Sequence, residues 1–286
     1  MKNNSEIVFF GTDAFSICVL EELKVGGFLP KLIVTAPDNK VGRGLILTPP
    51  PVKIWAEKNN IEVLQPETLS DTSFISTLST PPYTLFIVAS YGKIIPQSVL
   101  DIPERGVLNV HPSLLPKYRG ATPIQSQILA DDKNVGVTIM LMDAGVDHGP
   151  MITSSSVPLQ DWPIKSSKLE DILGKEGGKI LTEVIPGWIE GSVISVAQDH
   201  QKATFTKKIK KEDGLINLSS DSRQNFLKFC AFEDSVGVYF LVLRKGVQIR
   251  VKIAEAILKD GVFTAVTVVP EGGRKMSYED FLRGLS

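Results

Sequence analysis

The chain has 286 residues, of which 43% are hydrophobic and 22% are charged, and its formal net charge is −1. This composition is that of a soluble globular protein, and the length is sufficient for a large core and two domains. Because positive and negative charges almost cancel, there is no global basic field, and any contact with nucleic acid must use a local patch.

Cysteine and histidine usage argues against a disulfide-stabilised or metal-dependent protein. The two cysteines, Cys18 and Cys230, form no CxxC pair, and a reducing compartment fits them best. The three histidines are scattered, so we expect no metal site. The apolar run at 7–10 is too short for a signal peptide, and no segment approaches the ~20 apolar residues of a membrane helix. We therefore expect a cytoplasmic protein that does not contact membranes.

The first part of the chain alternates strand-like and helix-like segments. Apolar runs typical of buried strands lie at 6–10, 32–35, 83–88 and 107–110. Segments with helical patterns lie between them, at 14–24, 52–59 and 71–78. This alternation predicts an α/β fold with a doubly wound, mostly parallel sheet whose ligand cleft opens at the carboxyl ends of the strands.

The second part of the chain changes character. A long helical segment spans 166–190, and the polar residues 191–203 predict a linker between a first domain at 1–190 and a second domain at 204–286. In the second domain, β-rich runs are separated by glycine or charged turns, and they lie at 236–243, 248–258 and 262–269. These runs predict a small antiparallel barrel or sheet.

The residues best suited to chemistry gather in two glycine- and proline-rich segments, 109–120 and 142–149. Asn109 can donate a hydrogen bond without titrating, which suits the stabilisation of an oxyanion. His111 lies on the same side of the predicted strand and can relay a proton near neutral pH. Asp147 lies 38 residues beyond Asn109 (147 − 109), so only the fold can bring its carboxylate close enough to orient the imidazole or a water molecule. Together these groups predict acyl transfer to an amine.

Each segment taken alone also has an ordinary interpretation. An asparagine or histidine at the end of a strand often serves a turn. The pattern Asp-x-Gly-x-Asp-x-Gly is similar to a calcium loop, but it lacks the further oxygen ligands and the closing glutamate of an EF-hand. The occurrence of both segments, in this order and after a predicted strand, favours a catalytic site.

The two segments together resemble the active-site motifs of the folate-dependent formyltransferases, which are Asn-x-His-x-Ser-Leu-Leu-Pro and a later Asp-x-Gly-x-Asp-x-Gly. Further segments resemble the methionyl-tRNA formyltransferases within that family, and these are 7–15, 36–44 with 51–53, 203–217 and 269–282. The resemblance covers nearly the whole chain. It implies a Rossmann-like doubly wound domain followed by a smaller OB-like β-barrel domain that binds tRNA.

The resemblance also implies roles for individual residues. It assigns catalysis to Asn109, His111 and Asp147. It assigns contact with the folate to four consecutive residues, Ser113, Leu114, Leu115 and Pro116. It assigns the pterin pocket to backbone groups of Ala89, Tyr91 and Gly92. The implied formyl donor is 10-formyltetrahydrofolate and the implied acceptor is the amino group of initiator methionyl-tRNA, and we expect a monomer that uses no metal.

Two groups of basic residues are predicted to contact the tRNA. Arg43 lies between two glycines, in a loop that resembles one entering the acceptor-stem region in the family. Lys207 and Lys208 begin a basic run at the start of the second domain. Such a run is either a solvated face or a track of phosphate contacts that position the nucleic acid without reading its sequence.

Three alternatives remain open at this point. An enzyme of the same chemistry could formylate a nucleotide-linked aminosugar or glycinamide ribonucleotide, although the second substrate leaves the β-rich domain without a purpose. A catalytically silent RNA-binding protein could also use this scaffold, but the complete set of Asn109, His111 and Asp147 argues against it. The loop around Arg43 and the segment 270–277 favour tRNA over an aminosugar.

Overall fold

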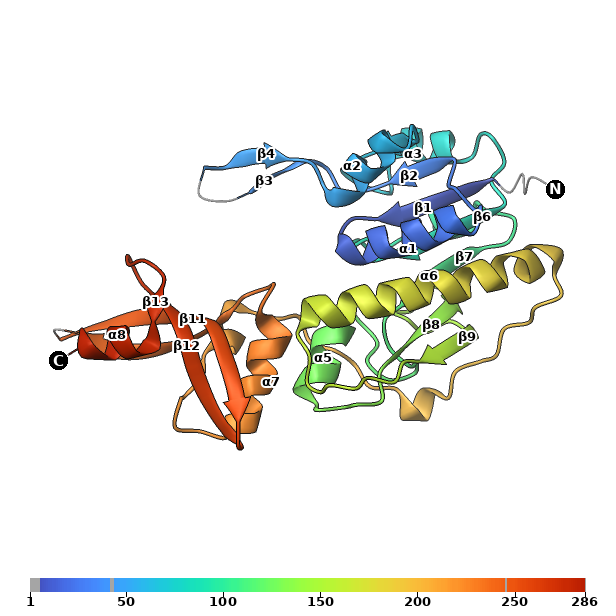
Figure 1. The fold of residues 1–286 in the computed structure, drawn as a ribbon. Coiled ribbons are helices and arrows are strands. Elements are labelled where there is room, and N and C mark those ends of the chain that lie inside the picture. The colour runs from blue at the N-terminus through green and yellow to red at the C-terminus, as the bar shows by residue number, and fades with distance from the viewer. Residues whose placement is uncertain (1–5, 42–43, 245, 286) are drawn as a thin grey trace. The chain divides into compact units, whose positions relative to one another are not determined.

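A computed structural model of the chain describes residues 6–41, 44–244 and 246–285, and these divide into two units (Figure 1). The first unit contains the chain up to Ala121 together with Asn134–Pro158 and Glu170–Thr206. The second unit contains Thr122–Lys133, Leu159–Leu169 and the chain from Lys207 onward. The domain bounds expected from the sequence, 1–190, 191–203 and 204–286, are contiguous ranges and stay a prediction.

The first unit is built on a seven-stranded sheet with the order β5-β2-β1-β6-β7-β8-β9. Its strands are β1 (Ile7–Gly11), β2 (Leu32–Val34), β5 (Glu62–Leu64), β6 (Leu85–Ala89), β7 (Val107–His111), β8 (Gly136–Leu141) and β9 (Met151–Ser156). Neighbours from β5 to β7 pair in parallel, whereas β8 and β9 add antiparallel pairs at one edge. The predicted doubly wound, mostly parallel sheet is confirmed.

The direction in which the sheet grows reverses between β1 and β6. From β1 the sheet grows through β2 to β5, and from β6 it grows the other way through β7. In doubly wound sheets such a switch point opens a crevice at the carboxyl ends of the strands. Those ends are Gly11 of β1, Ala89 of β6 and His111 of β7, so two of the predicted site residues lie at this edge.

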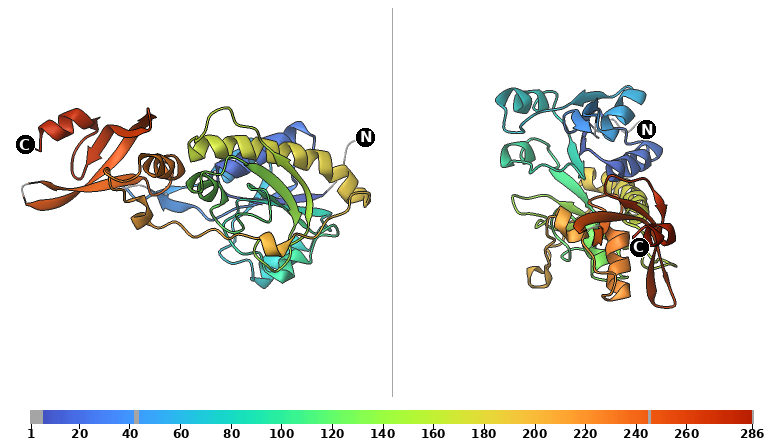
Figure 2. Two further views of the ribbon diagram at one scale, coloured as in Figure 1. Left: turned by 90° about the horizontal axis from the view of Figure 1, so that it is seen from below. Right: turned by 90° about the vertical axis from the view of Figure 1, so that its left-hand side faces the viewer.

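Helices cover both faces of this sheet (Figure 2), and they are α1 (Ala14–Val25), α2 (Pro51–Lys58), α3 (Thr72–Leu78), α4 (Gln97–Leu100) and α6 (Ser166–Glu190). Helix α6 packs unusually closely because of a glycine pair within it. A methyl group on Gly177 would lie 2.5 Å from Cγ1 of Val110, and one on Gly178 would lie 2.6 Å from Cβ of Glu22. The pair therefore lets α6 approach both β7 and α1.

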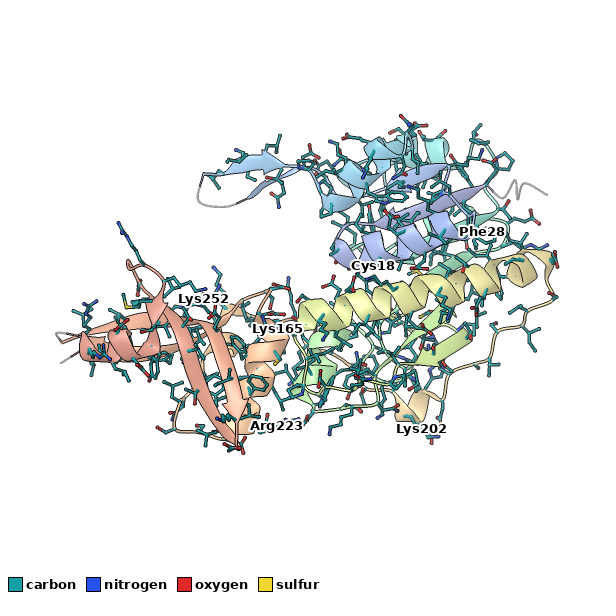
Figure 3. All side chains as sticks on the ribbon, in the orientation of Figure 1. Cys18, Phe28, Lys165, Lys202, Arg223 and Lys252 are labelled. Carbon is teal, nitrogen blue, oxygen red and sulfur yellow. The ribbon has the colours of Figure 1, made fainter. Side chains whose placement is uncertain are left out.

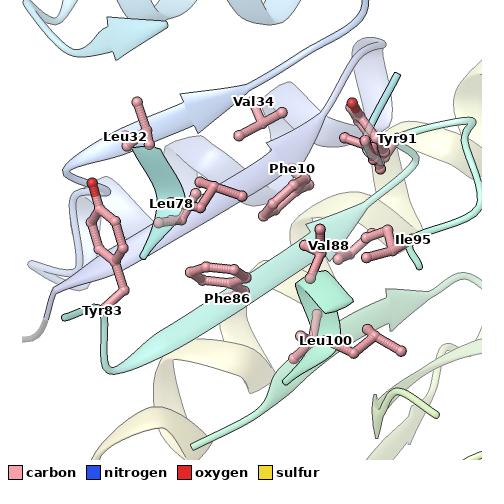
Figure 4. Packing of buried hydrophobic residues seen from close by; sticks show 14 of the residues in the cluster. Phe10, Leu32, Val34, Leu78, Tyr83, Phe86, Val88, Tyr91, Ile95 and Leu100 are labelled. Atoms are coloured by element: carbon pink, nitrogen blue, oxygen red, sulfur yellow. The ribbon is translucent and has the colours of Figure 1, made fainter. Parts of the chain in front are cut away.

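An aromatic cluster fills the opposite face of the sheet (Figure 4). The ring of Phe10 lies 5.4 Å from that of Phe86 and 5.5 Å from that of Tyr91, between centroids. Leu78 of α3 and Leu100 of α4 pack against the same cluster. Because Phe10 belongs to β1 while Phe86 belongs to β6, this packing fixes the two strands on either side of the switch point.

The segment between β2 and α2 forms a hairpin of β3 (Asn39–Val41) and β4 (Ile46–Thr48), which the sequence analysis treated as a loop. Three consecutive apolar side chains on it are exposed, Leu45, Ile46 and Leu47. An ion pair of 2.9 Å between Lys53 and Asp38 ties the base of the hairpin to α2. Arg43, which is predicted to contact the tRNA, lies outside the described residues.

The second unit pairs four strands in the order β10-β11-β12-β13, all antiparallel. The strands are β10 (Val238–Arg244), β11 (Val247–Lys259), β12 (Val262–Pro270) and β13 (Met276–Ser277). Helices α7 (Ser222–Phe232) and α8 (Tyr278–Arg283) pack against this sheet. The three β-rich runs predicted from the sequence correspond to β10, β11 and β12, so the predicted antiparallel sheet is confirmed.

Helix α5 (Pro123–Leu129) also belongs to the second unit, although it lies early in the sequence. Arg223 of α7, labelled in Figure 3, donates to the carboxylate of Asp131 just after α5 at 2.8 and 3.1 Å. Trp162 donates to the same carboxylate at 2.7 Å. These hydrogen bonds, above all that from Arg223, hold the pKa of Asp131 below its usual range.

Phe86 offers a test of how far the sheet depends on the aromatic cluster. Phe86→Ala should lower the free energy of unfolding by about 3–5 kcal/mol, because it removes a fully buried ring and leaves a cavity. Urea denaturation followed by circular dichroism measures this change. The control is Ile94→Ala, at a side chain that is 88% exposed, and it should change the stability by less than about 0.5 kcal/mol. Equal effects of the two substitutions would contradict this account of the core.

Candidate active site

Asn109 and His111 lie at the carboxyl end of β7 and point to the same side of the strand. Both are buried, with 9% and 4% of their surface exposed. The loop after β8 folds back over β7 and brings Asp147 to them. Its Oδ1 lies 3.3 Å from Nδ2 of Asn109 and 3.7 Å from Nδ1 of His111. The structure thus brings together the three side chains that were predicted to act together.

The hydrogen bonds of His111 distinguish its two ring nitrogens. Nε2 lies 3.1 Å from the carbonyl oxygen of Tyr118. A carbonyl oxygen only accepts, so Nε2 carries a proton, and this tautomer follows from the hydrogen-bond partners. Nδ1 is therefore the nitrogen that can take up or release a proton, and it is the one that faces Asp147.

Asp147 is held from both sides of its carboxylate. Oδ2 accepts the backbone N–H of Gly120 at 2.7 Å, while Oδ1 faces Asn109 and His111. Its backbone has φ of +45°, in the left-handed region that is unfavourable for most residues and better tolerated by aspartate. This local backbone shape turns the carboxylate back toward β7.

The segment predicted to contact the folate is fixed by internal hydrogen bonds. The hydroxyl of Ser113 is fully buried and donates to the carbonyl of Lys117 at 2.7 Å. The hydroxyl of Thr138 on β8 donates to the carbonyl of Ser113 at 2.7 Å and accepts from the N–H of Leu115 at 3.1 Å. Leu115 is buried, and Leu114 and Pro116 are partly exposed. The segment is therefore a stiff wall, in which Ser113 shapes the backbone with its hydroxyl.

The residues predicted for the pterin pocket follow the end of β6. The carbonyl of Ala89 accepts from the hydroxyl of Ser16 at 2.7 Å, and the carbonyl of Tyr91 accepts from Thr12 at 3.0 Å. Burial raises the pKa of the Tyr91 phenol to about 12, so this group stays protonated. Gly92 has φ of +83° and open space beside it. Backbone groups of this segment are thus held in place beside an open position at Gly92.

Asp13, which directly precedes α1, lies at the same edge of the sheet. Its carboxylate caps α1 by accepting from Ser16 and also accepts a hydrogen bond from Ser90. Burial raises the pKa of the Asp13 carboxyl, although the hydrogen bonds from Ser90 and Ser16 act in the opposite direction. Asp13 thus links the turn after β1 to the turn after β6.

The lysines predicted to contact the tRNA belong to a different unit from the site residues described above. Lys207 and Lys208 are exposed and belong to the second unit. Within residues 6–41, 44–244 and 246–285, no group of histidine, cysteine, aspartate or glutamate side chains is arranged to hold a metal ion. In the same ranges, none of the helices has the length and apolar character needed to cross a membrane.

Sequence reasoning missed two buried polar residues next to Asp147. Arg119 is 3% exposed and Gln198 is 5% exposed, and their side chains are joined by hydrogen bonds of 2.6 and 3.2 Å. Arg119 lies in the predicted motif segment and could have been noticed as the charged residue before Gly120. Gln198 lies in the predicted linker, where no local pattern distinguishes it from other polar residues.

This arrangement has a definite chemical capacity. An amide N–H of Asn109 can stabilise a developing oxyanion, and Nδ1 of His111 can accept a proton. The carboxylate of Asp147 can attract a cation, and it orients Asn109 by accepting its amide N–H. Such a set suits the attack of a substrate amine on a carbonyl carbon and does not require a nucleophile from the protein.

Comparison with known proteins agrees with this chemistry. Residues 5–185 match the formyl transferase family. The fold is similar to that of a sugar N-formyltransferase from a Shewanella species, with a TM-score of 0.65 and 16% identity, over 89% of this chain and 99% of that chain. It is also similar to a methionyl-tRNA formyltransferase from Clostridium thermocellum, with a TM-score of 0.60 and 14% identity, over 96% of this chain and 99% of that chain. The fold and the match define the chain as a formyl transferase.

Sequence identity then indicates which family of formyl transferases the chain belongs to. The methionyl-tRNA formyltransferase of Chloroflexus aurantiacus is 40% identical over 267 residues, which are 93% of this chain and 85% of that protein. The chain belongs to the methionyl-tRNA formyltransferase family. The resemblance drawn from the sequence motifs is confirmed.

The catalytic effects of His111 and Asp147 should be coupled, because Oδ1 of Asp147 faces Nδ1 of the His111 imidazole. His111→Ala and Asp147→Ala should each lower kcat for formyl transfer by on the order of 100-fold or more. The double variant should be little worse than the worse single variant, because coupled catalytic groups are not additive. Single-turnover rates in a double-mutant cycle measure this coupling, and pairing His111→Ala with Val25→Ala, at an exposed side chain at the end of α1, supplies an additive control. Strictly additive losses for His111 and Asp147 would show that they act independently.

Proposed function

We propose that the protein transfers the formyl group of 10-formyltetrahydrofolate to the free amino group of initiator methionyl-tRNA. The observation that carries this proposal is the shared position of Asn109, His111 and Asp147 around one carboxylate oxygen at β7. The 40% identity to a methionyl-tRNA formyltransferase over most of both chains supports the choice of acceptor. The enzyme acts in the cytoplasm as a monomer in this proposal.

The proposed reaction is a direct transfer between two nitrogen atoms. The substrate amine forms a bond to the formyl carbon, and the carbonyl oxygen becomes an oxyanion. One N–H of Asn109 is engaged by Asp147, and the second N–H is available to this oxyanion. The proton of the attacking nitrogen passes by way of Nδ1 of His111 or a water molecule held by Asp147 to the leaving nitrogen of the folate. The bond between that nitrogen and the formyl carbon then breaks.

The donor would lie between two fixed backbone segments. The wall at 113–116 is held by Thr138 and Lys117, and the segment at 89–92 is held by Ser16 and Thr12. Fixed backbone N–H and carbonyl groups suit the edge of a pterin ring, which both donates and accepts hydrogen bonds. This fit supports the folate-contacting roles of Ser113, Leu114, Leu115, Pro116, Ala89, Tyr91 and Gly92.

The tRNA would be held mainly through its phosphates. Lys207 and Lys208 are exposed on the second unit, and Arg43 supplies a further cation in the sequence segment 36–44, which resembles the tRNA-contacting loop of the family. Lysine and arginine contacts to phosphates position a nucleic acid and make its binding dependent on salt. The alternative acceptor is a nucleotide-linked aminosugar, which would need fewer such contacts. The proposal therefore includes a salt-sensitive KM for the acceptor.

The proposed function is tested by direct assay of the wild-type protein. Incubation with 10-formyltetrahydrofolate and methionyl-tRNA should release tetrahydrofolate, which is followed by absorbance. The KM for the tRNA should rise with salt, and Lys207→Ala together with Lys208→Ala should reduce the slope by about two phosphate contacts. Methionyl-tRNA whose amine is already formylated is the control and should not react. Turnover with an aminosugar nucleotide and none with methionyl-tRNA would replace the proposal with the alternative.

Asn109→Ala should remove the oxyanion donor. The expected loss is about 100- to 1000-fold in kcat, or ~2.7–4 kcal/mol of transition-state stabilisation, by analogy with other oxyanion donors. The dissociation constant of the folate should be nearly unchanged, which calorimetry can measure. A variant that keeps wild-type turnover would remove Asn109 from the proposed mechanism.

A further inference from the structure

Gln198 stands apart from the rest of its segment. It is 5% exposed and is the one buried residue between Gly191 and Ala203, all of which the structure describes. A polar side chain is unfavourable in such a place unless its hydrogen bonds are satisfied. The contacts that Gln198 makes therefore explain how this segment is held against the loop after β8.

The carboxamide of Gln198 uses all of its polar atoms on one loop and one cation. Nε2 donates to the carbonyl of Asp147 at 2.9 Å and to the carbonyl of Gly149 at 2.7 Å. Oε1 accepts from Nη2 and Nε of Arg119 at 2.6 and 3.2 Å. Arginine can only donate and carbonyls can only accept, so these partners fix which end of the amide faces which group.

The loop that Gln198 holds has an unfavourable backbone conformation and little free space beside it. Asp147 has a left-handed backbone, and the chain at Gly149 is so close to β8 that a methyl group there would lie 2.0 Å from the carbonyl oxygen of Leu141. On the other side of the turn, the N–H of Gly120 holds the Asp147 carboxylate at 2.7 Å. Gln198 therefore fixes the backbone of Asp147, while Gly120 fixes its side chain.

Arg119 connects these two restraints. It directly precedes Gly120 and directly follows Tyr118, whose carbonyl fixes the tautomer of His111. Its guanidinium binds Gln198 and also donates to Nδ1 of His200 at 2.9 Å. One buried cation thus joins the segment that orients His111 to the segment that orients Asp147.

We infer that Gln198 and Arg119 are positioning residues for formyl transfer, acting through the backbone of Asp147 and the segment 118–120. This inference rests on the proposed function for its readout in kcat. Neither side chain needs to touch the substrates. Their role is to keep Oδ1 of Asp147 at its distance from Asn109 and His111, because small displacements of reacting groups lower the rate sharply.

The test compares Gln198→Met with Gln201→Met. Methionine keeps the length of the side chain but removes its hydrogen bonds, and Gln201 is an exposed glutamine in the same segment, which makes it a matched control. A second variant, Gln198→Glu, keeps an acceptor for Arg119 and removes both donors to the loop. The readouts are kcat and KM for both substrates, together with amide hydrogen exchange of the segment 142–150.

Gln198→Met and Gln198→Glu should both lower kcat by on the order of 10- to 100-fold, and both KM values should stay within about twofold. Hydrogen exchange should accelerate in 142–150 but not throughout the first unit, and Gln201→Met should behave as the wild type. Wild-type kcat in Gln198→Met, or a change confined to KM, would overturn the inference. Faster exchange spread over the whole unit would also overturn it, because it would show a general structural role.

Failure of the proposed function would have a different signature. In that case the wild-type protein would not formylate methionyl-tRNA at all, whatever residue stands at 198. The hydrogen-exchange comparison does not depend on turnover, and it would still test whether Gln198 holds the Asp147 loop. Unchanged exchange in 142–150 for both Gln198 variants would refute the positioning role on its own.

Discussion

The arrangement of this site depends on one carboxylate that serves three partners. Oδ1 of Asp147 faces Asn109 and His111, and Oδ2 accepts the N–H of Gly120. A carboxylate can only accept, so the amide of Asn109 must turn its nitrogen toward it. The opposite orientation would place oxygen against oxygen. The same contact that holds Asn109 therefore leaves its second N–H free to act as an oxyanion donor in the proposed reaction.

The chain has to reverse its direction after β8 to bring the Asp147 carboxylate to β7. Strand β8 runs antiparallel to β7 and ends with Leu141 opposite Leu108, near the start of β7. The loop after β8 therefore has to fold back along the sheet to reach Asn109. The left-handed backbone of Asp147 and the tight packing at Gly149 belong to this reversal. The close approach to Leu141 explains why the second motif ends in Gly149, for which the Asp-x-Gly-x-Asp-x-Gly pattern alone gave no geometric reason.

The range of each interaction decides how much of this could be predicted from the sequence. Buried parallel strands such as β1 and β7 show continuous apolar runs, and the two-residue spacing of Asn109 and His111 already places them on one side of a strand. Strand β9 (Met151–Ser156) was not predicted, because it is rich in serine and sits at the edge of the sheet. Gln198 was missed for a related reason: its partners lie 51 and 79 residues away, and nothing near it in sequence signals its burial.

The remaining polar groups explain why the nucleophile should come from the substrate. The hydroxyl of Ser113 is buried and bound to the carbonyl of Lys117, so it is not free to attack a carbonyl carbon. Cys18, labelled in Figure 3, faces Asp171, and burial raises its pKa to about 11, so its thiol is not ionised at neutral pH.

A direct transfer to an amine needs that amine uncharged, because an ammonium has no lone pair. A carboxylate alone would attract the ammonium and keep it protonated. In the proposed reaction the two neighbouring groups would divide this work, since the Asp147 carboxylate would draw the amine in and Nδ1 of His111 would accept its proton.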